Sequence, residues 1–195
     1  MMVIYVAKIP ELIKGDLYCK ERIEEINSCT NEKVKKQKFY AWKLLELCAE
    51  NLGFNAEHLH FYKLENGKWK CNEFDFSLSH SEDYVSVILS NEKVGIDLQK
   101  SCTIKTDFFA EKILTRKEGL DFINLSESEK QRYLLKKWTQ KECVYKMLES
   151  SNLKISEINC NDYPIKTCEL VLDGDTYYLS YAPTEKDIDV HLIKI

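Results

Sequence analysis

The chain changes its pattern abruptly near residue 98, and this change limits the folds that are open to it. Three short apolar segments that are typical of strands precede the change: residues 74–78, 84–90 and 93–98. After it, Thr115-x-x-Glu118 and Ser126-x-x-Glu129 match capping boxes, so we expect a helix to begin at each place. The second of these helices continues to about residue 149. Strands followed by helices in one chain predict a mixed α and β fold.

Further strand and helix patterns occur on both sides of this change. Strand patterns cover residues 3–9, 59–64, 68–70, 168–172, 176–181 and 190–195. Residues 33–50 have apolar side chains at helical spacing, which predicts a helix. Asn66-Gly67 lies between two short strand patterns and predicts a hairpin turn. Each half therefore contains helix and strand, and we expect an α+β fold of two packed α/β subdomains, residues 1–100 and 101–195.

The composition excludes several classes of protein. A net charge of −4 over 195 residues argues against a broad basic surface for nucleic acid. The eight cysteines contain no C-x-x-C pair and no zinc-ligand spacing, so we expect free thiols in a reducing compartment. The first apolar run ends at Lys8 with no basic segment before it, unlike a signal peptide, and no apolar run is long enough to span a membrane. We therefore expect a soluble, cytoplasmic protein.

The strand that ends near residue 98 carries an acidic side chain. Its apolar residues alternate with Gly95, Asp97 and Gln99, which share the opposite face of the strand. A carboxylate near a strand end is a candidate ligand for a hard metal ion. A solvent-facing aspartate on a half-exposed strand would give the same pattern, and the strand alone does not decide between them.

The long helix carries a second acid, Glu142. Leu135, Trp138 and Tyr145 fall on the same stripe of the helix as Glu142, which indicates that this stripe is buried. A buried carboxylate needs a partner, because an unpaired buried charge is costly. A metal ion or Lys146, four residues further on, would serve. The alternative is an ordinary surface pair between Glu142 and Lys146.

Small hydroxyl groups and a histidine gather at the end of another apolar strand, in the segment S-L-S-H-S at residues 77–81. These side chains suit hydrogen bonding to phosphate oxygens, and they suit a capped turn equally well. The chain has no glycine-rich phosphate loop and no G-x-S-x-G elbow.

Three motifs occur in a fixed order between Phe76 and Lys146: F-S-L-S-H-S, then V-G-I-D-L, then W-T-Q-K-E-C-V-Y-K. This order resembles the 4′-phosphopantetheinyl transferase superfamily, whose pattern is an S-H-S strand, a G-I-D-I-E strand and a W-x-x-K-E-x-x-x-K helix. The position of S-H-S before G-I-D is similar to the surfactin-synthetase type. The smaller holo-acyl-carrier-protein synthases begin with their G-I-D strand. Weaker likeness extends out to Lys33 and through the closing strands.

The resemblance implies both a fold and a reaction. The fold would have two pseudo-twofold-related α/β subdomains, with coenzyme A and magnesium in the cleft between them. In the reaction, a serine hydroxyl of an apo carrier protein attacks the diphosphate of coenzyme A, the 4′-phosphopantetheine arm is transferred, and 3′,5′-ADP leaves. Acyl, peptidyl and aryl carriers of fatty-acid, polyketide or nonribosomal peptide biosynthesis are all possible acceptors. Because this type completes its cleft alone, we expect a monomer.

The resemblance also implies roles for individual residues. Asp97 and Glu142 would bind magnesium together with Gln99, and Glu142 would also accept the serine proton. Lys141 and Lys146 would steady the diphosphate. Further contacts to coenzyme A would come from Ser79 and His80 at its phosphates, Gly67 and Lys68 near the nucleotide, and Lys33 and Lys36 near the 3′-phosphate. Phe108 and Phe109 lie where such enzymes meet the carrier protein.

The chain departs from the family pattern at three places. Gln99 replaces a third acid, and because an amide is a weaker ligand for a hard cation, metal affinity falls or a water intervenes. Trp69 replaces the proline of a G-K-P segment. Residues 147–153 contain no glycine where the family commonly has a glycine turn after its final lysine.

Two other functions compete with transfer. The first is a binding protein that has kept the fold and lost turnover, which Gln99 favours. The second is an unrelated magnesium-dependent phosphotransferase or nuclease, which the absence of a basic stripe disfavours for polynucleotide substrates.

Overall fold

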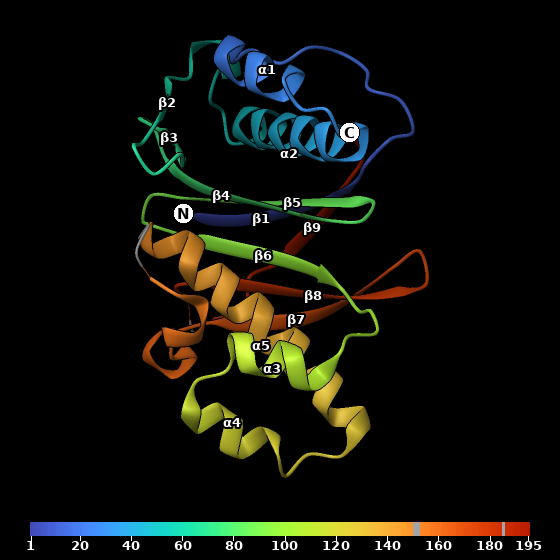
Figure 1. The fold of residues 1–195 in the computed structure, drawn as a ribbon. Helices are drawn as coiled ribbons and strands as arrows, with labels where there is room; N and C mark the ends of the chain where they lie inside the picture. The colour runs from blue at the N-terminus through green and yellow to red at the C-terminus, as the bar shows by residue number, and fades with distance from the viewer. Residues whose placement is uncertain (150–152, 185) are drawn as a thin grey trace. The chain divides into compact units, whose positions relative to one another are not determined.

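The computed structural model describes residues 1–149, 153–184 and 186–195. The chain has a mixed α and β fold, as the alternation of strand and helix patterns predicts (Figure 1). None of the helices in these ranges has the length and hydropathy needed to cross a membrane. All eight cysteines lie in these ranges and are free thiols.

The chain divides into two compact units, and the division differs from the expected boundary near residue 100. The first unit contains Met1–Val94 together with Ile188–Ile195, and the second contains Gly95–Asp187. The strand that carries Asp97 therefore belongs to the second unit, because it pairs with a strand near the end of the chain. The last strand returns to the first unit, where it pairs with the first strand of the chain.

The first unit is a four-stranded sheet with helices on one face. Its elements are β1 (Met2–Lys8), α1 (Lys20–Asn27), α2 (Glu32–Asn51), the short 3₁₀ turn η1 (Ala56–His58), β2 (Phe61–Lys63), β3 (Trp69–Cys71), β4 (Asp75–Ser81), β5 (Tyr84–Ser90) and β9 (Val190–Ile193). The strand order is β4-β5-β1-β9, in which β9 runs parallel to β1 and the other pairs are antiparallel. A hairpin formed by β2 and β3 stands apart as a second, two-stranded sheet.

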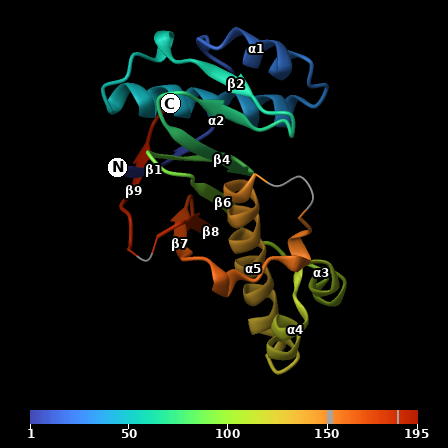
Figure 2. The ribbon, with the colours of Figure 1, turned by 90° about the vertical axis from the view of Figure 1, so that its left-hand side faces the viewer.

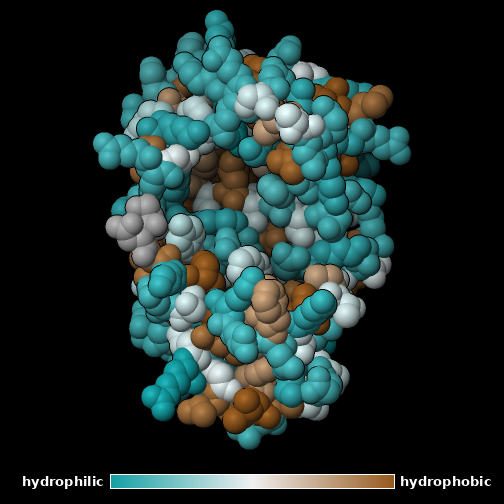
Figure 3. Space-filling view, in the orientation of Figure 1, coloured by the Kyte–Doolittle hydropathy of each residue, from teal (hydrophilic) through white to brown (hydrophobic). Residues whose placement is uncertain are grey.

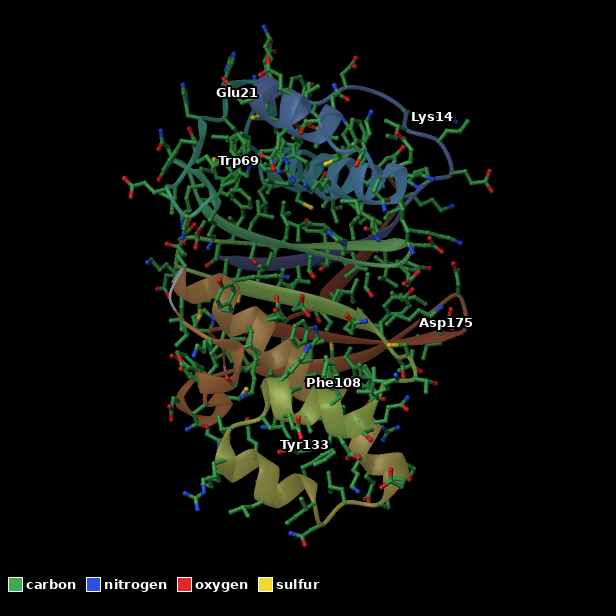
Figure 4. All side chains as sticks on the ribbon, in the orientation of Figure 1. Lys14, Glu21, Trp69, Phe108, Tyr133 and Asp175 are labelled. Carbon is green, nitrogen blue, oxygen red and sulfur yellow. The ribbon has the colours of Figure 1, made fainter. Side chains whose placement is uncertain are left out.

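Helix α2 forms the core of the first unit. Asn31 caps its first turn by accepting a hydrogen bond from the Val34 N–H at 3.1 Å. Trp42, which is fully buried, packs its ring 5.4 Å from Trp69 of the hairpin and 5.9 Å from Phe76 of β4. Figure 4 labels Trp69 beside this layer of helices. The aromatic contacts explain why so short a hairpin is held in place.

A segment without regular structure, residues 9–19, is tied to α2 by its main chain, and we call it the strap. The Tyr40 hydroxyl donates to the Leu12 carbonyl oxygen at 2.6 Å, and the Lys43 ammonium donates to the Asp16 carbonyl oxygen at 2.9 Å. The Glu46 carboxylate accepts from the Tyr18 N–H at 2.8 Å. These side chains lie on successive turns of one face of the helix, so α2 replaces the backbone pairing that the strap lacks.

Glu46 makes the stability of the first unit depend on pH. Burial raises the pKa of its carboxyl to about 7, although the Tyr18 N–H and Lys43 act against the rise. The folded chain therefore binds this proton more tightly than the unfolded chain, so its free energy of unfolding falls as pH rises from the ordinary value of 4.5 through about 7. In Glu46→Gln the amide oxygen still accepts from Tyr18 and carries no charge. The free energy of unfolding of Glu46→Gln, measured in urea and relative to that of the wild type, should rise over this pH range by on the order of 3 kcal/mol. Parallel pH profiles for the two proteins would contradict the prediction.

The second unit is a three-stranded sheet covered by a long helix. Its elements are β6 (Gly95–Lys100), α3 (Thr106–Ile113), α4 (Arg116–Phe122), α5 (Glu127–Leu148), the 3₁₀ turns η2 (Ile155–Glu157) and η3 (Cys160–Asp162), β7 (Lys166–Leu172) and β8 (Asp175–Ala182). The strand order is β6-β8-β7, and both pairs are antiparallel. Helix α5 lies along one face of this sheet, and α3 and α4 pack on the side of α5 away from the sheet (Figure 2).

Both predicted capping boxes are present. At the start of α4, the Glu118 N–H donates to the Thr115 hydroxyl at 3.2 Å, and the Thr115 N–H donates back to the Glu118 carboxylate at 2.9 Å. At the start of α5, the Glu129 carboxylate likewise accepts from the Ser126 N–H at 2.9 Å, and the Ser126 hydroxyl donates to the same carboxylate at 2.5 Å. Helix α5 ends at Leu148, and its C-cap residue Glu149 has a φ of 59°, in the left-handed region that favours glycine. Within the rest of the glycine-free segment, residues 150–152 lie outside the described residues.

Helix α5 approaches β6 so closely that only glycine fits at the start of the G-I-D motif. A Cβ atom on Gly95 would lie 2.0 Å from the carbonyl oxygen of Cys143, which is far inside van der Waals contact. The Cys143 thiol in turn lies 3.2 Å from the Gly95 carbonyl oxygen. This contact between two backbones holds the second half of α5 against the strand that carries Asp97.

Candidate active site

The second unit brings Asp97, Glu142 and Lys146 together. Asp97 lies on β6 and faces α5, where the Lys146 ammonium is 2.7 Å from its Oδ1 atom. The same ammonium donates to the Ile96 carbonyl oxygen at 3.3 Å. Lys146 therefore pairs across elements with Asp97, whereas the sequence pattern alone suggested a pair with Glu142 on its own helix.

Glu142 is a second carboxylate of the same group. Burial raises the pKa of its carboxyl above the ordinary value, the negative charge of Asp97 adds to the rise, and the positive charge of Lys146 opposes it. Two acids that repel each other in a poorly hydrated place favour a bound cation. The Lys146 ammonium supplies part of that positive charge in this structure.

The donor set suits one hard divalent ion that keeps water ligands. Among the residues that the structure describes, no group of three or more His, Cys, Asp or Glu side chains has metal-site geometry. Asp97 and Glu142 supply two carboxylates, and Gln99 follows Asp97 on the same face of β6. The Gln99 amide nitrogen donates to the Lys100 carbonyl oxygen at 3.1 Å, and its oxygen is a neutral ligand at most. Magnesium accepts one or two protein carboxylates with water and phosphate oxygens, so these residues fit it.

The predicted stripe of α5 is only half-buried. Leu135 is buried, but Trp138, Glu142 and Tyr145 are partly exposed. The most buried residues of α5 lie on the flanks of this stripe and on the opposite side of the helix: Leu134, Thr139, Lys141, Cys143, Val144 and Met147. The reason is that α5 is packed between the sheet on one side and α3 with the 3₁₀ turns on the other, which leaves the stripe at the edge of both contacts.

Lys141 does not belong to the group, which corrects its assignment to the diphosphate. Its side chain is fully buried, and its ammonium lies 2.7 Å from the Glu118 carboxylate and donates to the Ile158 carbonyl oxygen at 2.8 Å. Burial raises the pKa of the Glu118 carboxyl, but hydrogen bonds from Lys141 and Thr115 outweigh it and hold the pKa below the ordinary value. Lys141 points away from Asp97 because successive residues of a helix point about 100° apart.

Lys141→Met should therefore destabilise the chain. The substitution leaves Glu118 buried without its nearest cation, and breaking a buried ion pair from one side costs about 3 kcal/mol. Lys136→Met is the matched control, because Lys136 forms a half-exposed pair with Glu169 at 2.8 Å on the same helix and should cost under about 1 kcal/mol. Chemical denaturation of the three proteins measures both effects. Equal losses in the two variants would show that the Lys141 pair contributes no more than a surface pair.

The first unit contains a separate pocket of about 670 Å³ that includes Lys33 and Lys36. It is lined by Ile9, Glu11, Leu12, Ile13, Glu32, Lys33, Lys36, Gln37, Glu82 and Asp83. Lys33 pairs with Glu82 at 2.6 Å, and Lys36 donates to the Glu11 carbonyl oxygen. The pocket thus combines two ammonium groups, from the first turns of α2, with an apolar wall from the strap.

His80 and Ser79 point to opposite faces of the sheet. They are neighbours on β4, and Ser79 is buried whereas His80 is exposed. His80 lies four residues after Phe76, whose ring contacts Trp42, so His80 is on the face that α2 covers. The turn that follows His80 contains Glu82, the partner of Lys33. His80 therefore lies near the lysine pocket, and Ser79 does not.

The Gly67-Lys68 turn is also separate from this pocket. Gly67 has a φ of 84° in the predicted hairpin turn, and neither residue is among those that line the pocket. Trp69, which follows the turn, donates to Glu25 of α1 at 3.0 Å. The hairpin is thus fixed to α1, whereas the lysine pocket lies at the start of α2.

Hydrophobic side chains are exposed on α3 and α4. Phe108 is 59% exposed, as is Leu120, and Ile123 is 66% exposed. Figure 3 shows hydrophobic residues over these helices in its lower part. Phe109 instead packs against Trp138 with 5.4 Å between the ring centres. Of the two phenylalanines predicted to meet a partner, only Phe108 is largely exposed to solvent.

Sequence reasoning missed two sets of residues around these sites. The strap residues of the lysine pocket have no motif and are brought there by hydrogen bonds to α2. Thr139 and Ser180, both fully buried, lie beside Glu142 and Asp97. The only sequence signal for Thr139 is its position three residues before Glu142, which places the two side chains on adjacent turns.

Comparison with known families connects the second unit to one of them. The family model described as the 4′-phosphopantetheinyl transferase superfamily matches residues 93–192. The match includes β6 with Asp97 and Gln99, and α5 with Glu142 and Lys146. No curated protein matches the chain.

Proposed function

The chain belongs to the 4′-phosphopantetheinyl transferase superfamily, and on this premise we propose that it transfers 4′-phosphopantetheine from coenzyme A to a serine of an apo carrier protein. The other product is 3′,5′-ADP. The observation that carries the proposal is the group of Asp97, Glu142 and Lys146, two carboxylates and an ammonium within the matched region. An S-H-S strand ahead of the matched region favours the surfactin-synthetase type.

The residues of the second unit suit the chemistry of this transfer. The serine oxygen forms a bond to the phosphorus that carries the pantetheine arm, and the bond from that phosphorus to the oxygen bridging to the ADP phosphate breaks. Glu142 would accept the serine proton, and the Lys146 ammonium would bind the diphosphate as negative charge builds on its oxygens. A magnesium ion, when bound, neutralises charge on the diphosphate oxygens. Asp97 and Glu142 would hold it, with Gln99 as a neutral or water-mediated third ligand.

Residues of the first unit would recognise the nucleotide end of coenzyme A. Lys33 and Lys36 are the two cations of a pocket that four acidic residues also line, and they would bind the 3′-phosphate there in place of the Glu82 carboxylate that pairs with Lys33. His80, on the same side of the sheet, would add a further hydrogen bond. The apolar strap residues Leu12 and Ile13 would pack against the adenine ring. Ser79 and the Gly67-Lys68 turn have no part in this pocket.

Loading of apo carrier proteins tests the proposal. The chain is incubated with coenzyme A, magnesium and one of several apo acyl, peptidyl or aryl carriers, and each carrier is weighed by mass spectrometry. We expect at least one carrier to gain the mass of a single phosphopantetheine arm, with equal release of 3′,5′-ADP. Replacing the acceptor serine of that carrier with alanine should abolish both products. If no carrier gains mass while coenzyme A binds, the proposal of transfer is wrong.

Gln99 favours one second function, a coenzyme A-binding or carrier-binding protein without turnover. An amide in place of a third acid weakens the site for a hard cation. In that case calorimetry would show that coenzyme A binds the chain, and no carrier would gain mass with any divalent ion.

A further inference from the structure

A row of polar side chains from all three strands of the second unit lies under α5. Asp97 of β6 is directly opposite Ser180 of β8, and Ser180 is directly opposite Thr167 of β7. Residues directly opposite each other in a sheet point to the same face. Since Asp97 faces α5, Ser180 and Thr167 face α5 as well.

Four side chains form a hydrogen-bonded chain whose direction is determined at every step, and we call it the hydroxyl chain. The Thr139 hydroxyl donates its one proton to the Lys136 carbonyl oxygen at 3.0 Å, so it can only accept from Ser180, which is 2.9 Å away. Ser180 has then used its proton, so Thr167 must donate to Ser180 at 2.9 Å. Thr167 in turn accepts from the Gln140 amide at 3.1 Å.

The hydroxyl chain begins and ends on α5 and passes through β7 and β8. Thr139 and Ser180 are both fully buried, so either hydroxyl left without its partner would have no water to replace it. A rotation of α5, or a shift along its axis, would break the bonds at both ends. The hydroxyl chain therefore permits one placement of α5 against the sheet, and the Cys143–Gly95 contact holds the same placement one turn further on.

This placement decides where the two acids meet. Thr139 precedes Glu142 by three residues on the same side of α5, and Ser180 is the strand partner of Asp97. We infer that Thr139 and Ser180 are positioning residues that hold Glu142 opposite Asp97, so that both carboxylates face one cation. The consequence for catalysis rests on the proposed transfer, whereas the consequence for cation binding does not.

Variants that remove single hydroxyls test the inference. Thr139→Val keeps the shape of the side chain and removes its hydroxyl, Ser180→Ala removes the next one, and Thr139→Ser restores the bond. Val144→Ala is the matched control, because Val144 is fully buried on α5 in an apolar cluster with Ile158 and takes no part in the hydroxyl chain. All proteins are compared per folded molecule by Mn²⁺ binding, with and without coenzyme A, and by carrier loading.

We expect Thr139→Val and Ser180→Ala to weaken Mn²⁺ binding and lower kcat by roughly 10- to 100-fold, the range that is typical when groups that orient metal ligands are removed. KM for coenzyme A should stay within about twofold, because the substrate contacts are unchanged. Thr139→Ser should recover most of both losses, and Val144→Ala should lose stability alone.

Three results would overturn the inference: wild-type Mn²⁺ affinity in Thr139→Val, the same loss of affinity in Val144→Ala, or a wild-type chain that binds no Mn²⁺ in either condition. A wild-type chain that binds Mn²⁺ and loads no carrier would refute the proposed transfer, and the Mn²⁺ affinities of the variants would still decide the role of the hydroxyl chain.

Discussion

Glu142→Gln should fold like the wild type and lose nearly all transfer of phosphopantetheine. The substitution removes one of the two negative charges that face the cation, and it removes the group proposed to accept the serine proton. Loss of a group that stabilises charge in a transition state commonly lowers kcat on the order of a hundredfold or more. Carrier loading is measured by mass spectrometry at saturating coenzyme A and magnesium, and folding by urea unfolding.

A matched control separates this effect from a general change of charge. Glu169→Gln also removes a carboxylate that contacts α5, since Glu169 pairs with Lys136 at 2.8 Å on the surface. Its transfer rate should remain within about twofold of wild type, because an exposed pair contributes little. Loading by Glu142→Gln at the wild-type rate would remove Glu142 from the catalytic group.

Asp97→Asn should be the second variant with a large loss of activity. Asp97 is buried, and its carboxylate is the partner of the Lys146 ammonium at 2.7 Å. An asparagine keeps the shape and offers a neutral oxygen, so the cation loses a charged ligand and Lys146 loses its nearest counter-charge. We expect transfer to fall about a hundredfold at saturating coenzyme A, and the magnesium concentration for half-maximal activity to increase.

The control for Asp97→Asn is Asp175→Asn in the same sheet. Asp175, labelled in Figure 4, pairs with Lys100 of β6 at 2.5 Å, but the pair lies at the surface. Loss of this surface pair in Asp175→Asn should leave the magnesium concentration for half-maximal transfer unchanged. An Asp97→Asn variant that keeps the wild-type magnesium dependence would show that the cation binds elsewhere, even if the chain is a transferase.

Several elements could be predicted because their signals are local. The capping boxes at Thr115 and Ser126 place the starts of α4 and α5, since the capping side chains belong to the same turn that they stabilise. Asn66-Gly67 likewise places the β2–β3 hairpin, because Gly67 adopts a positive φ at no steric cost. Helices α1 and α3 lack such signals: their N-cap residues, Cys19 and Lys105, make no side-chain cap, and neither helix was predicted.

The acidic members of the site could also be predicted from the sequence, and its lysines only in part. The strand period places Asp97 and Gln99 on one face, and the helix period places Lys146 beside Glu142. Periodicity gives relative positions within one element but not the rotation of that element in the fold. The structure shows that Lys146 turns to Asp97 and that Lys141 turns to Glu118, on the far side of α5.

The sequence by itself therefore determined the order of the strands and of helices α2, α4 and α5, and their starts where a cap or a turn is local. It also indicated Asp97 and Glu142 as the two candidate acids. Only the tertiary structure decided which unit each strand joins, since β6 and β9 pair with strands more than 75 residues away in the chain. It also decided which face of α5 meets the sheet. That choice depends on the close contact of Gly95 with Cys143 and on the hydroxyl chain. The hydroxyls of that chain come from separate segments, and they find hydrogen-bond partners for their buried positions only after those segments have packed together.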